Sequence, residues 1–296
     1  QYMMFFTQKG KCFWMRVYEI PEGSKTAKGR ALQNLINIES DDKVKAFICT
    51  QDLKDKEYVS SHNLVMVTKQ GQVKKTSLEK YSKPRVNGVA AITIKEGDEL
   101  LAAQLTNGES QIILAVKSGK LVRFEETKTR PMGRTASGVR GITLKDESDE
   151  VIGMVSVNDM ESEILVVAEN GYGKRTKLVD DDGIDVYRIT NRGGKGVKTL
   201  NITEKTGALI AINNVTDADD LMIINKSGLT IRMMVSDLRV MGRATQGVRL
   251  INIKGTDSIA AVTKVLREEE AEEVSDEFQG AIEDGEIDET SEEIQE

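Results

Sequence analysis

The sequence has little of what most enzyme sites require. Its 296 residues include one histidine, His62, and two cysteines, Cys12 and Cys49, whose spacing fits neither a zinc site nor a redox pair. One histidine cannot build a multi-histidine metal centre, so we expect His62 to be structural. We expect both cysteines to be buried as small apolar residues. Paired carboxylates stay open as an enzyme alternative because acids are plentiful, although no motif marks a pair. The sequence therefore predicts no catalytic residue, no metal and no cofactor.

Long apolar runs are also missing. No stretch approaches the roughly 18 residues that a membrane helix needs, and no charged-then-apolar segment opens the chain as a secretion signal would. These absences predict a cytoplasmic protein without a membrane partner. The chain begins at Gln1 rather than at a methionine, which predicts a piece of a longer protein. Aromatic residues make up only 4% of the chain.

Charge is unevenly distributed along the chain. Residues 268–296 hold fifteen Asp and Glu and no Lys or Arg, which leaves 33 acidic against 41 basic residues in 1–267. A basic body attracts polyanions, whereas an acidic run with few apolar residues cannot bury enough surface to fold. We predict a folded domain over 1–266 and a disordered acidic tail over 267–296. The tail is either an electrostatic regulator that competes with a polyanion for the basic body or a silent solubilising terminus.

A repeat of about fifty residues organises the body. An apolar run, a short turn with glycine and then a basic residue recur five times; the runs begin at Tyr2, Leu64, Ile112, Ile164 and Leu221, and the turn glycines are Gly10, Gly71, Gly119, Gly171 and Gly228. Apolar runs that end in such turns are typical of β-hairpins. Each period should therefore begin with a hairpin.

Two further β elements complete each period. The first reads Gly-Val followed by alternating Ile or Leu, as at Gly88, Gly138, Gly196 and Gly247, with a degenerate copy around residues 35–38. The second is an apolar segment after a charged turn, as at Val44–Cys49. Four strands per 40–60 residues are the signature of a propeller blade. The fold class is thus all-β, with five visible blades and a sixth if one strand pair were missing upstream.

Basic residues recur at fixed places in the repeats. One register, four residues after the turn glycine, and a second, two residues after the Gly-Val glycine, should form a belt around the rim. Glycine-rich loops between them should let the backbone approach phosphates. The predicted nucleic-acid contacts are Lys75, Arg123, Arg134, Arg140, Arg175, Arg192, Lys195, Lys198, Arg232, Arg243 and Arg249, and the predicted phosphate-approach glycines are Gly133, Gly138, Gly193, Gly194, Gly196, Gly242 and Gly247.

A curved basic belt suits a long polyanion that must bend, and duplex DNA offers phosphates along a continuous path. Single-stranded DNA fits less well because no aromatic series interleaves with the basic residues. The alternative is a protein-interaction propeller whose basic rim meets an acidic partner. For single basic residues, and for the glycine-rich turns, a purely structural role stays open.

Two stretches of the chain resemble a known family. Residues 13–22 (Phe-Trp-Met-Arg-Val-Tyr-Glu-Ile-Pro-Glu), with Lys28-Gly29-Arg30, and the loop Gly133–Ile142 are similar to the C-terminal domain of the DNA gyrase A protein, which is a type IIA topoisomerase component. The resemblance covers about residues 1–266. It implies a six-bladed β-pinwheel, a propeller-like ring whose blades exchange strands. Arg192–Gly196 matches the core of the family's basic box but lies in the fourth repeat.

The resemblance also implies a function. Such a domain binds and bends or wraps duplex DNA without strong sequence specificity and supports negative supercoiling, while the catalytic tyrosine and the ATP site lie outside it. The implied partners are duplex DNA, the rest of gyrase A and gyrase B, with this piece monomeric on its own. None of the chain's tyrosines is given a catalytic role. The equivalent domain of topoisomerase IV is the closest alternative.

Overall fold

The computed structural model describes residues 1–265 except 25, 254 and 256. The predicted tail over 267–296 lies outside these residues. The described chain forms nineteen β-strands, one α-helix and five short 3-10 helices. The strands are β1 Tyr2–Thr7, β2 Lys11–Arg16, β3 Val44–Thr50, β4 Asn63–Thr68, β5 Gln72–Ser77, β6 Val89–Ala90, β7 Leu100–Thr106, β8 Gln111–Val116, β9 Lys120–Glu125, β10 Val139–Arg140, β11 Val151–Val157, β12 Glu163–Ala168, β13 Tyr172–Lys177, β14 Val197–Lys198, β15 Leu209–Val215, β16 Asp220–Asn225, β17 Thr230–Met234, β18 Val248–Arg249 and β19 Ile259–Val265.

Five antiparallel hairpins form the centre of five small sheets, as the repeat predicts. The hairpins are β1–β2, β4–β5, β8–β9, β12–β13 and β16–β17. All five turn glycines have positive φ, between 80° and 88°. Each hairpin's first strand also pairs with the strand that follows the charged turn, for example β1 with β3. The all-β, propeller-like prediction is confirmed by these sheets, which we number blades 1 to 5 in chain order.

The outermost strand of each complete blade comes from the next repeat. Blade 1 has the order β3-β1-β2-β6, and β6 lies in the connection that leads into blade 2. In the same way β10 completes blade 2, β14 completes blade 3 and β18 completes blade 4. The strand exchange that the resemblance implies is therefore present. The borrowed strand links each blade to the connection of its successor by backbone hydrogen bonds.

The expectation of six blades is wrong. The described chain contains five hairpins and hence five blades, and the fifth has only three strands, in the order β17-β16-β19. Because every fourth strand is borrowed from the following repeat, the last hairpin has no donor among these residues. The degenerate element at 35–38 also differs from expectation, since the chain forms a 3-10 helix at Leu32–Asn34 and packs Ile36 onto blade 1.

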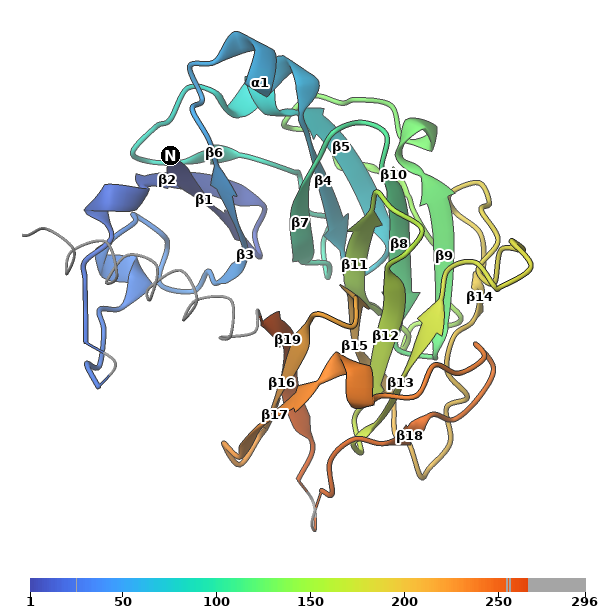
Figure 1. Ribbon diagram of the computed structural model, residues 1–296. Helices are drawn as coiled ribbons and strands as arrows, with labels where there is room; N and C mark the ends of the chain where they lie inside the picture. The colour runs from blue at the N-terminus through green and yellow to red at the C-terminus, as the bar shows by residue number, and fades with distance from the viewer. Residues whose placement is uncertain (25, 254, 256, 266–296) are drawn as a thin grey trace, which may run out of the picture.

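The blades lie in an arc around a central axis (Figure 1), with blade 1 and blade 5 at its two ends. The strands β3, β7, β11, β15 and β19 contact one another in sequence and line the axis. Apolar side chains fill the layers between neighbouring blades, as where Val65 and Val67 of blade 2 pack with Leu114 of blade 3. One helix, α1 (Lys56–Ser61), connects blade 1 to blade 2 and is capped by Asp55. The borrowed strands therefore lie at the outer edge of the arc.

Candidate nucleic-acid interface

The first predicted basic register is buried between blades rather than exposed. Lys75, Arg123 and Arg175 are 6%, 1% and 7% exposed. Lys75 lies 3.7 Å from Glu126, and Arg123 lies 3.0 Å from Asp185. Arg175 lies 3.1 Å from Glu163 and also bonds to Asp217. An outward-facing belt at this register is thus wrong for these three residues, because each guanidinium or ammonium group is already enclosed and paired.

Arg123 shows what this register does. It extends from β9 of blade 3 and donates to the carbonyl oxygen of Tyr187 at 2.9 Å and to the side chain of Gln111 at 2.7 Å. Arg175 of blade 4 likewise donates to the carbonyl oxygen of Leu238 at 2.6 Å, in blade 5. These side chains bond each blade to the connection of the next. Arg232, in the incomplete fifth blade, is the exposed member of the register and pairs with Asp220 at 2.9 Å.

The loops that precede and follow the borrowed strands form a continuous outer rim. Thr93, after β6, donates its hydroxyl to the carbonyl oxygen of Thr135 at 2.6 Å. Thr143, after β10, does the same to Gly193 at 2.7 Å. The amide of Asn201, after β14, donates to Thr245 at 3.0 Å. Each rim loop is therefore bonded to the next, which gives the outer edge one connected surface.

The predicted phosphate-approach glycines fall into two groups. Gly138, Gly196 and Gly247 have positive φ and lie so close to the preceding blade that an added Cβ would come within 2.5–2.7 Å of the carbonyl oxygens of Val73, Leu121 and Gly173. Their close approach is to protein, so for them the structure favours packing over ligand contact. Gly133 and Gly242 have nothing within 4 Å of an added Cβ. Gly194 is nearly as open, and Gly193 packs at 3.5 Å from the carbonyl oxygen of Arg140.

The remaining predicted contacts do lie on this rim. Arg140, Arg192, Lys195, Lys198, Arg243 and Arg249 are exposed and Arg134 is half-buried. Arg192 bonds to the carbonyl oxygens of Lys128 and Arg140, which bridges two rim loops. Lys198 donates to the side chain of Asn201 at 3.3 Å. None of these seven pairs with a carboxylate among the described residues, so their charges stay available to a polyanion.

A third basic register was missed by sequence reasoning. Lys80, Arg130, Arg188 and Arg239 each stand eight residues before the Gly-Val glycine of their repeat, and all four are exposed. The latter three precede Pro131, Ile189 and Val240, which bridge to the buried register at Lys75, Arg123 and Arg175. At each of these three bridges, the buried cation pairs with a residue that directly follows an exposed cation in the sequence. Counting back from the Gly-Val glycine would have found this register.

The rim segments contain no acidic residue. Residues 80–95, 127–145, 186–203 and 238–253 hold sixteen Lys and Arg and no Asp or Glu. Such segregation differs from an ordinary surface, where both signs are interspersed. The four segments include the borrowed strands of blades 1 to 4. These four segments therefore carry charged side chains of one sign only.

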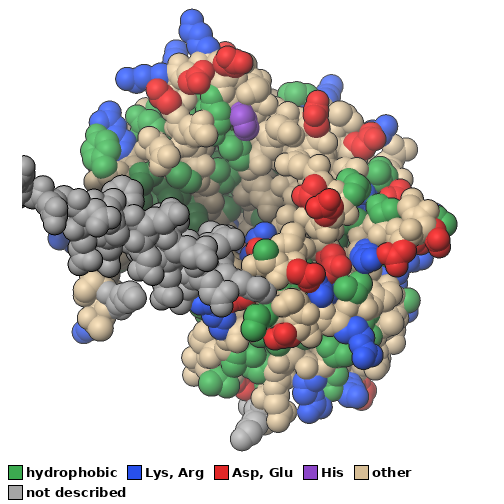
Figure 2. All heavy atoms as spheres, viewed as in Figure 1, with side chains coloured by type: hydrophobic (Ala, Val, Ile, Leu, Met, Phe, Trp, Pro, Cys, Tyr) green, Lys and Arg blue, Asp and Glu red, His purple; other side chains and the backbone are tan. Residues whose placement is uncertain are grey.

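The axis-facing turns have the opposite character. Lys45, Glu99, Lys69, Glu150 and Lys117 alternate in a chain of ion pairs across blades 1 to 3, at 3.4, 2.7, 3.5 and 3.8 Å. The Lys69 ammonium lowers the pKa of Glu99. Acidic and basic side chains are intermixed on the face that Figure 2 shows. These lysines are largely neutralised by their neighbours and are poor candidates for a polyanion.

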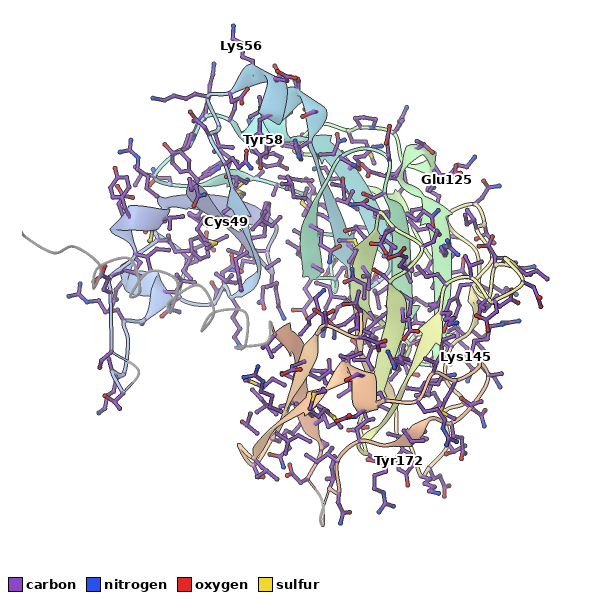
Figure 3. All side chains as sticks on the ribbon, in the orientation of Figure 1. Cys49, Lys56, Tyr58, Glu125, Lys145 and Tyr172 are labelled. Carbon is purple, nitrogen blue, oxygen red and sulfur yellow. The ribbon has the colours of Figure 1, made fainter. Side chains whose placement is uncertain are left out.

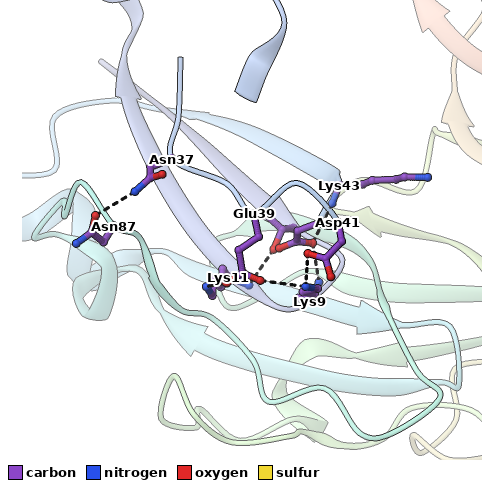
Figure 4. A network of polar contacts seen from close by, with 9 residues as sticks. Lys9, Lys11, Asn37, Glu39, Asp41, Lys43 and Asn87 are labelled. Atoms are coloured by element: carbon purple, nitrogen blue, oxygen red, sulfur yellow. Dashed lines mark hydrogen bonds and ion pairs between the residues drawn. The ribbon is translucent and has the colours of Figure 1, made fainter. Parts of the chain in front are cut away.

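Blade 1 is also neutralised near its hairpin turn. Lys9 bonds to Glu39 at 3.0 Å and to Asp41 at 2.6 Å, and Lys11 bonds to Glu39 at 2.6 Å (Figure 4). These two ammonium groups lower the pKa of Glu39 to about 2. The same view shows Asn37 donating to Asn87 of the first rim loop. Lys9 and Lys11 are therefore poor candidates for a polyanion as well.

Tyr172 anchors the last rim strand. Its hydroxyl accepts a hydrogen bond from Arg249 at 3.0 Å, and the cationic groups of Lys205 and Arg249 lie 5.4 and 5.6 Å from the ring centroid. Arg249 and Lys205 together lower the pKa of this hydroxyl. Figure 3 shows Tyr172 near β18 at the edge of the arc. The tyrosine therefore holds two cations at the rim.

The other special residues take structural roles or none. The ring of His62 contacts the carbonyl oxygen of Tyr58 at 2.8 Å. Cys12 is buried, which raises the pKa of its thiol, whereas Cys49 is exposed, contrary to our expectation. Within the described ranges no group of three or more His, Cys, Asp or Glu side chains could hold a metal ion. Among these residues no helix is long and apolar enough to cross a membrane.

Blades that exchange their outer strands and carry exposed cations on that edge define a β-pinwheel with a basic outer rim. The chain matches the family described as DNA gyrase C-terminal domain, beta-propeller, over residues 1–51, 62–107, 111–158, 162–216 and 219–265. These five matched segments correspond to the five blades. The chain belongs to this family.

Relatives and solved structures agree with this assignment. The chain is 43% identical over 285 residues to the DNA gyrase A protein of Staphylococcus aureus strain MRSA252, covering 96% of this chain and 31% of the relative. The chain thus spans about a third of the length of that relative. A topoisomerase IV C-terminal domain matches with a TM-score of 0.80 at 23% identity, covering 95% of this chain and 84% of the other. A DNA gyrase A C-terminal domain matches with a TM-score of 0.74 at 22% identity, and the match covers 90% of this chain and 82% of the other. Both structures support the fold.

Proposed function

We propose that the outer rim of blades 1 to 4 binds duplex DNA through its phosphates and bends it along the arc. The observation that carries this proposal is the set of four rim segments with sixteen cations and no carboxylate. Unpaired cations gain affinity for a polyanion by releasing its condensed counterions, with little dependence on base sequence. The hydrogen-bonded rim loops supply a continuous curved track for such contacts.

The same proposal places the chain as the non-catalytic C-terminal part of a gyrase A protein. Its partners would be duplex DNA, the remainder of gyrase A and gyrase B, and its role would be to support negative supercoiling in the cytoplasm. The 43% identity to the gyrase A protein supports gyrase over topoisomerase IV. Phosphate contact by arginine and lysine requires no cofactor, and we propose none for this part.

The test compares two triple variants that remove the same charge. Arg188→Ala/Arg192→Ala/Lys195→Ala strips the rim at blades 3 and 4, while Lys45→Ala/Lys69→Ala/Lys117→Ala removes three axis-facing lysines. Duplex binding is measured by filter retention over a salt series with two unrelated sequences. We expect the rim variant to lose affinity for both sequences and to reduce the salt slope by about 2–3, at about 0.9 per phosphate contact.

The axis variant is the matched control and should bind nearly as the parent does. Equal losses in both variants would mean that overall charge alone attracts DNA, and the rim would lose its special role. Weak parent binding with a shallow salt slope would instead favour the protein-interaction propeller with an acidic protein partner. Ligase-mediated circularisation of short duplexes then measures bending, which we expect the parent to promote.

A further inference from the structure

Two lysines are enclosed beneath the rim. Lys74 on β5 and Lys174 on β13 are both 0% exposed. Each stands three residues after its turn glycine, where the other blades have Phe13, Val122 and Ile231. The position lies within the apolar packing of the blades, as the burial of Phe13 and Val122 shows. A blade therefore folds with an apolar side chain at this place and does not need a lysine.

Both ammonium groups point at the rim loop of the next repeat. Lys74 donates to the carbonyl oxygens of Arg134 and Ala91, and Lys174 donates to the carbonyl oxygen of Gly242. Two of these acceptors, Arg134 and Gly242, lie in the two related Met-Gly-Arg loops that begin at Met132 and Met241, whereas Ala91 directly follows β6. The backbone amides of Met132 and Met241 bond at 2.7 and 2.9 Å to the carbonyl oxygens of Lys75 and Arg175. The lysine is thus a second attachment, deeper in the loop.

Folding alone gives no reason for these lysines. Burying an ammonium group is unfavourable unless a carboxylate or several hydrogen bonds compensate. Neither lysine pairs with a carboxylate within the described part of the chain. The charged neighbour of Lys74 is Arg134, a like charge, and burial lowers the pKa of both lysines to about 8. An apolar residue of similar volume would pack here at lower cost.

We propose that Lys74 and Lys174 are positioning residues that hold the two Met-Gly-Arg loops so that Arg134 and Arg243 present their charges to DNA. This inference rests on the proposed function of the rim. The two loops carry open glycines, Gly133 and Gly242, which leave the backbone little steric constraint. A buried hydrogen-bond donor supplies the missing constraint. Its positive charge also lies beneath the phosphate track, where low polarity strengthens its attraction.

The test uses Lys74→Met and Lys174→Met, which keep the length of the side chain and remove the donor. We expect each variant to melt at or above the parent's temperature and to lose about three- to tenfold in duplex affinity at moderate salt. Amide hydrogen exchange should accelerate in each variant only in the loop that its lysine holds. Residues 132–138 should respond to Lys74→Met alone, and residues 241–247 to Lys174→Met alone.

A double-mutant cycle separates positioning from general charge. If Lys74 acts through Arg134, then Lys74→Met added to Arg134→Ala should cost little further affinity. Fully additive losses, or unchanged exchange in both loops, would overturn the proposal. If instead the rim variants of the proposed function leave DNA binding intact, that function fails, while the exchange measurement still decides whether the lysines hold the loops.

Discussion

The molecule places two sets of basic residues in similar repeated patterns and uses them differently. Lys75, Arg123 and Arg175 are enclosed between blades and paired with carboxylates. Arg130, Arg188 and Arg239 directly precede the residues that bridge to this buried set, and they face solvent without carboxylate partners among the described residues. A repeated basic register is therefore no sign of a ligand by itself. Exposure of the side chain and the lack of a carboxylate partner among the described residues are the more informative features.

The largest expected effect is a difference in the free energy of unfolding between variants of the buried set and variants of the exposed set. Arg123→Ala removes a buried guanidinium that bonds to Tyr187 and Asp185, and it leaves those acceptors without their donor. We expect a loss of about 3 kcal/mol or more in the free energy of unfolding. Arg130→Ala, at an exposed rim position, should change stability by no more than about 0.5 kcal/mol. Urea unfolding of both variants measures the difference.

For duplex binding we expect the opposite: the rim variant should show the larger effect and the buried variant the smaller one. At a temperature where both variants are folded, Arg130→Ala should weaken DNA binding and reduce the salt slope by about 0.9. Folded Arg123→Ala should retain the slope of the parent. If Arg123→Ala loses phosphate contacts while it stays folded, the buried register contributes to binding and our comparison is incorrect.

Two glycines of one rim loop offer a smaller and finer contrast. Gly138 has φ of 87° and an added Cβ would meet the carbonyl oxygen of Val73 at 2.7 Å, whereas Gly133 has open space. Gly138→Ala should cost about 1–3 kcal/mol, since alanine is strained at positive φ and the neighbouring strand must move. Gly133→Ala should be nearly neutral in thermal unfolding. Equal melting temperatures would contradict the role of Gly138 in joining blades 2 and 3.

Much of the fold was predictable because it is local. An apolar run followed by a glycine turn specifies a hairpin within about fifteen residues, and the five hairpins and their positive-φ glycines are confirmed. The number of blades was not predictable from these signals. It depends on which hairpin receives a borrowed strand, and β17 receives none among the described residues.

The site was predictable only in part because burial is a non-local property. The partner of Lys75 is Glu126, 51 residues later, and the partner of Arg123 is Asp185, 62 residues later. No local pattern links these residues, so the register was assigned to the surface. The rim loops were predicted from their recurring basic residues and glycines, and most of their predicted cations are exposed. That these loops bind DNA stays a prediction.

The last expected effect concerns the pH dependence of stability at Lys74 and Lys174. Burial lowers the pKa of both from 10.5 to about 8 in the folded chain. Between about pH 8 and 10 the unfolded chain therefore keeps protons that the folded chain has released, so rising pH favours folding through these two groups. The gain is on the order of 1 kcal/mol per pH unit for each lysine. Cys12 opposes it near Lys74, because burial raises the pKa of that thiol in the folded chain.

The double variant Lys74→Met/Lys174→Met isolates the lysine contribution. Cys12 and Tyr81 are present in both proteins, so their titrations largely cancel in the difference between them. We expect the stability advantage of the variant over the parent to be greatest at pH 7 and to shrink as the pH rises toward 9.5. Urea unfolding at half-unit intervals measures this difference. Parallel pH profiles would mean that both lysines are solvated in the folded chain, and the contrast between buried and rim cations would then hold only for Lys75, Arg123 and Arg175.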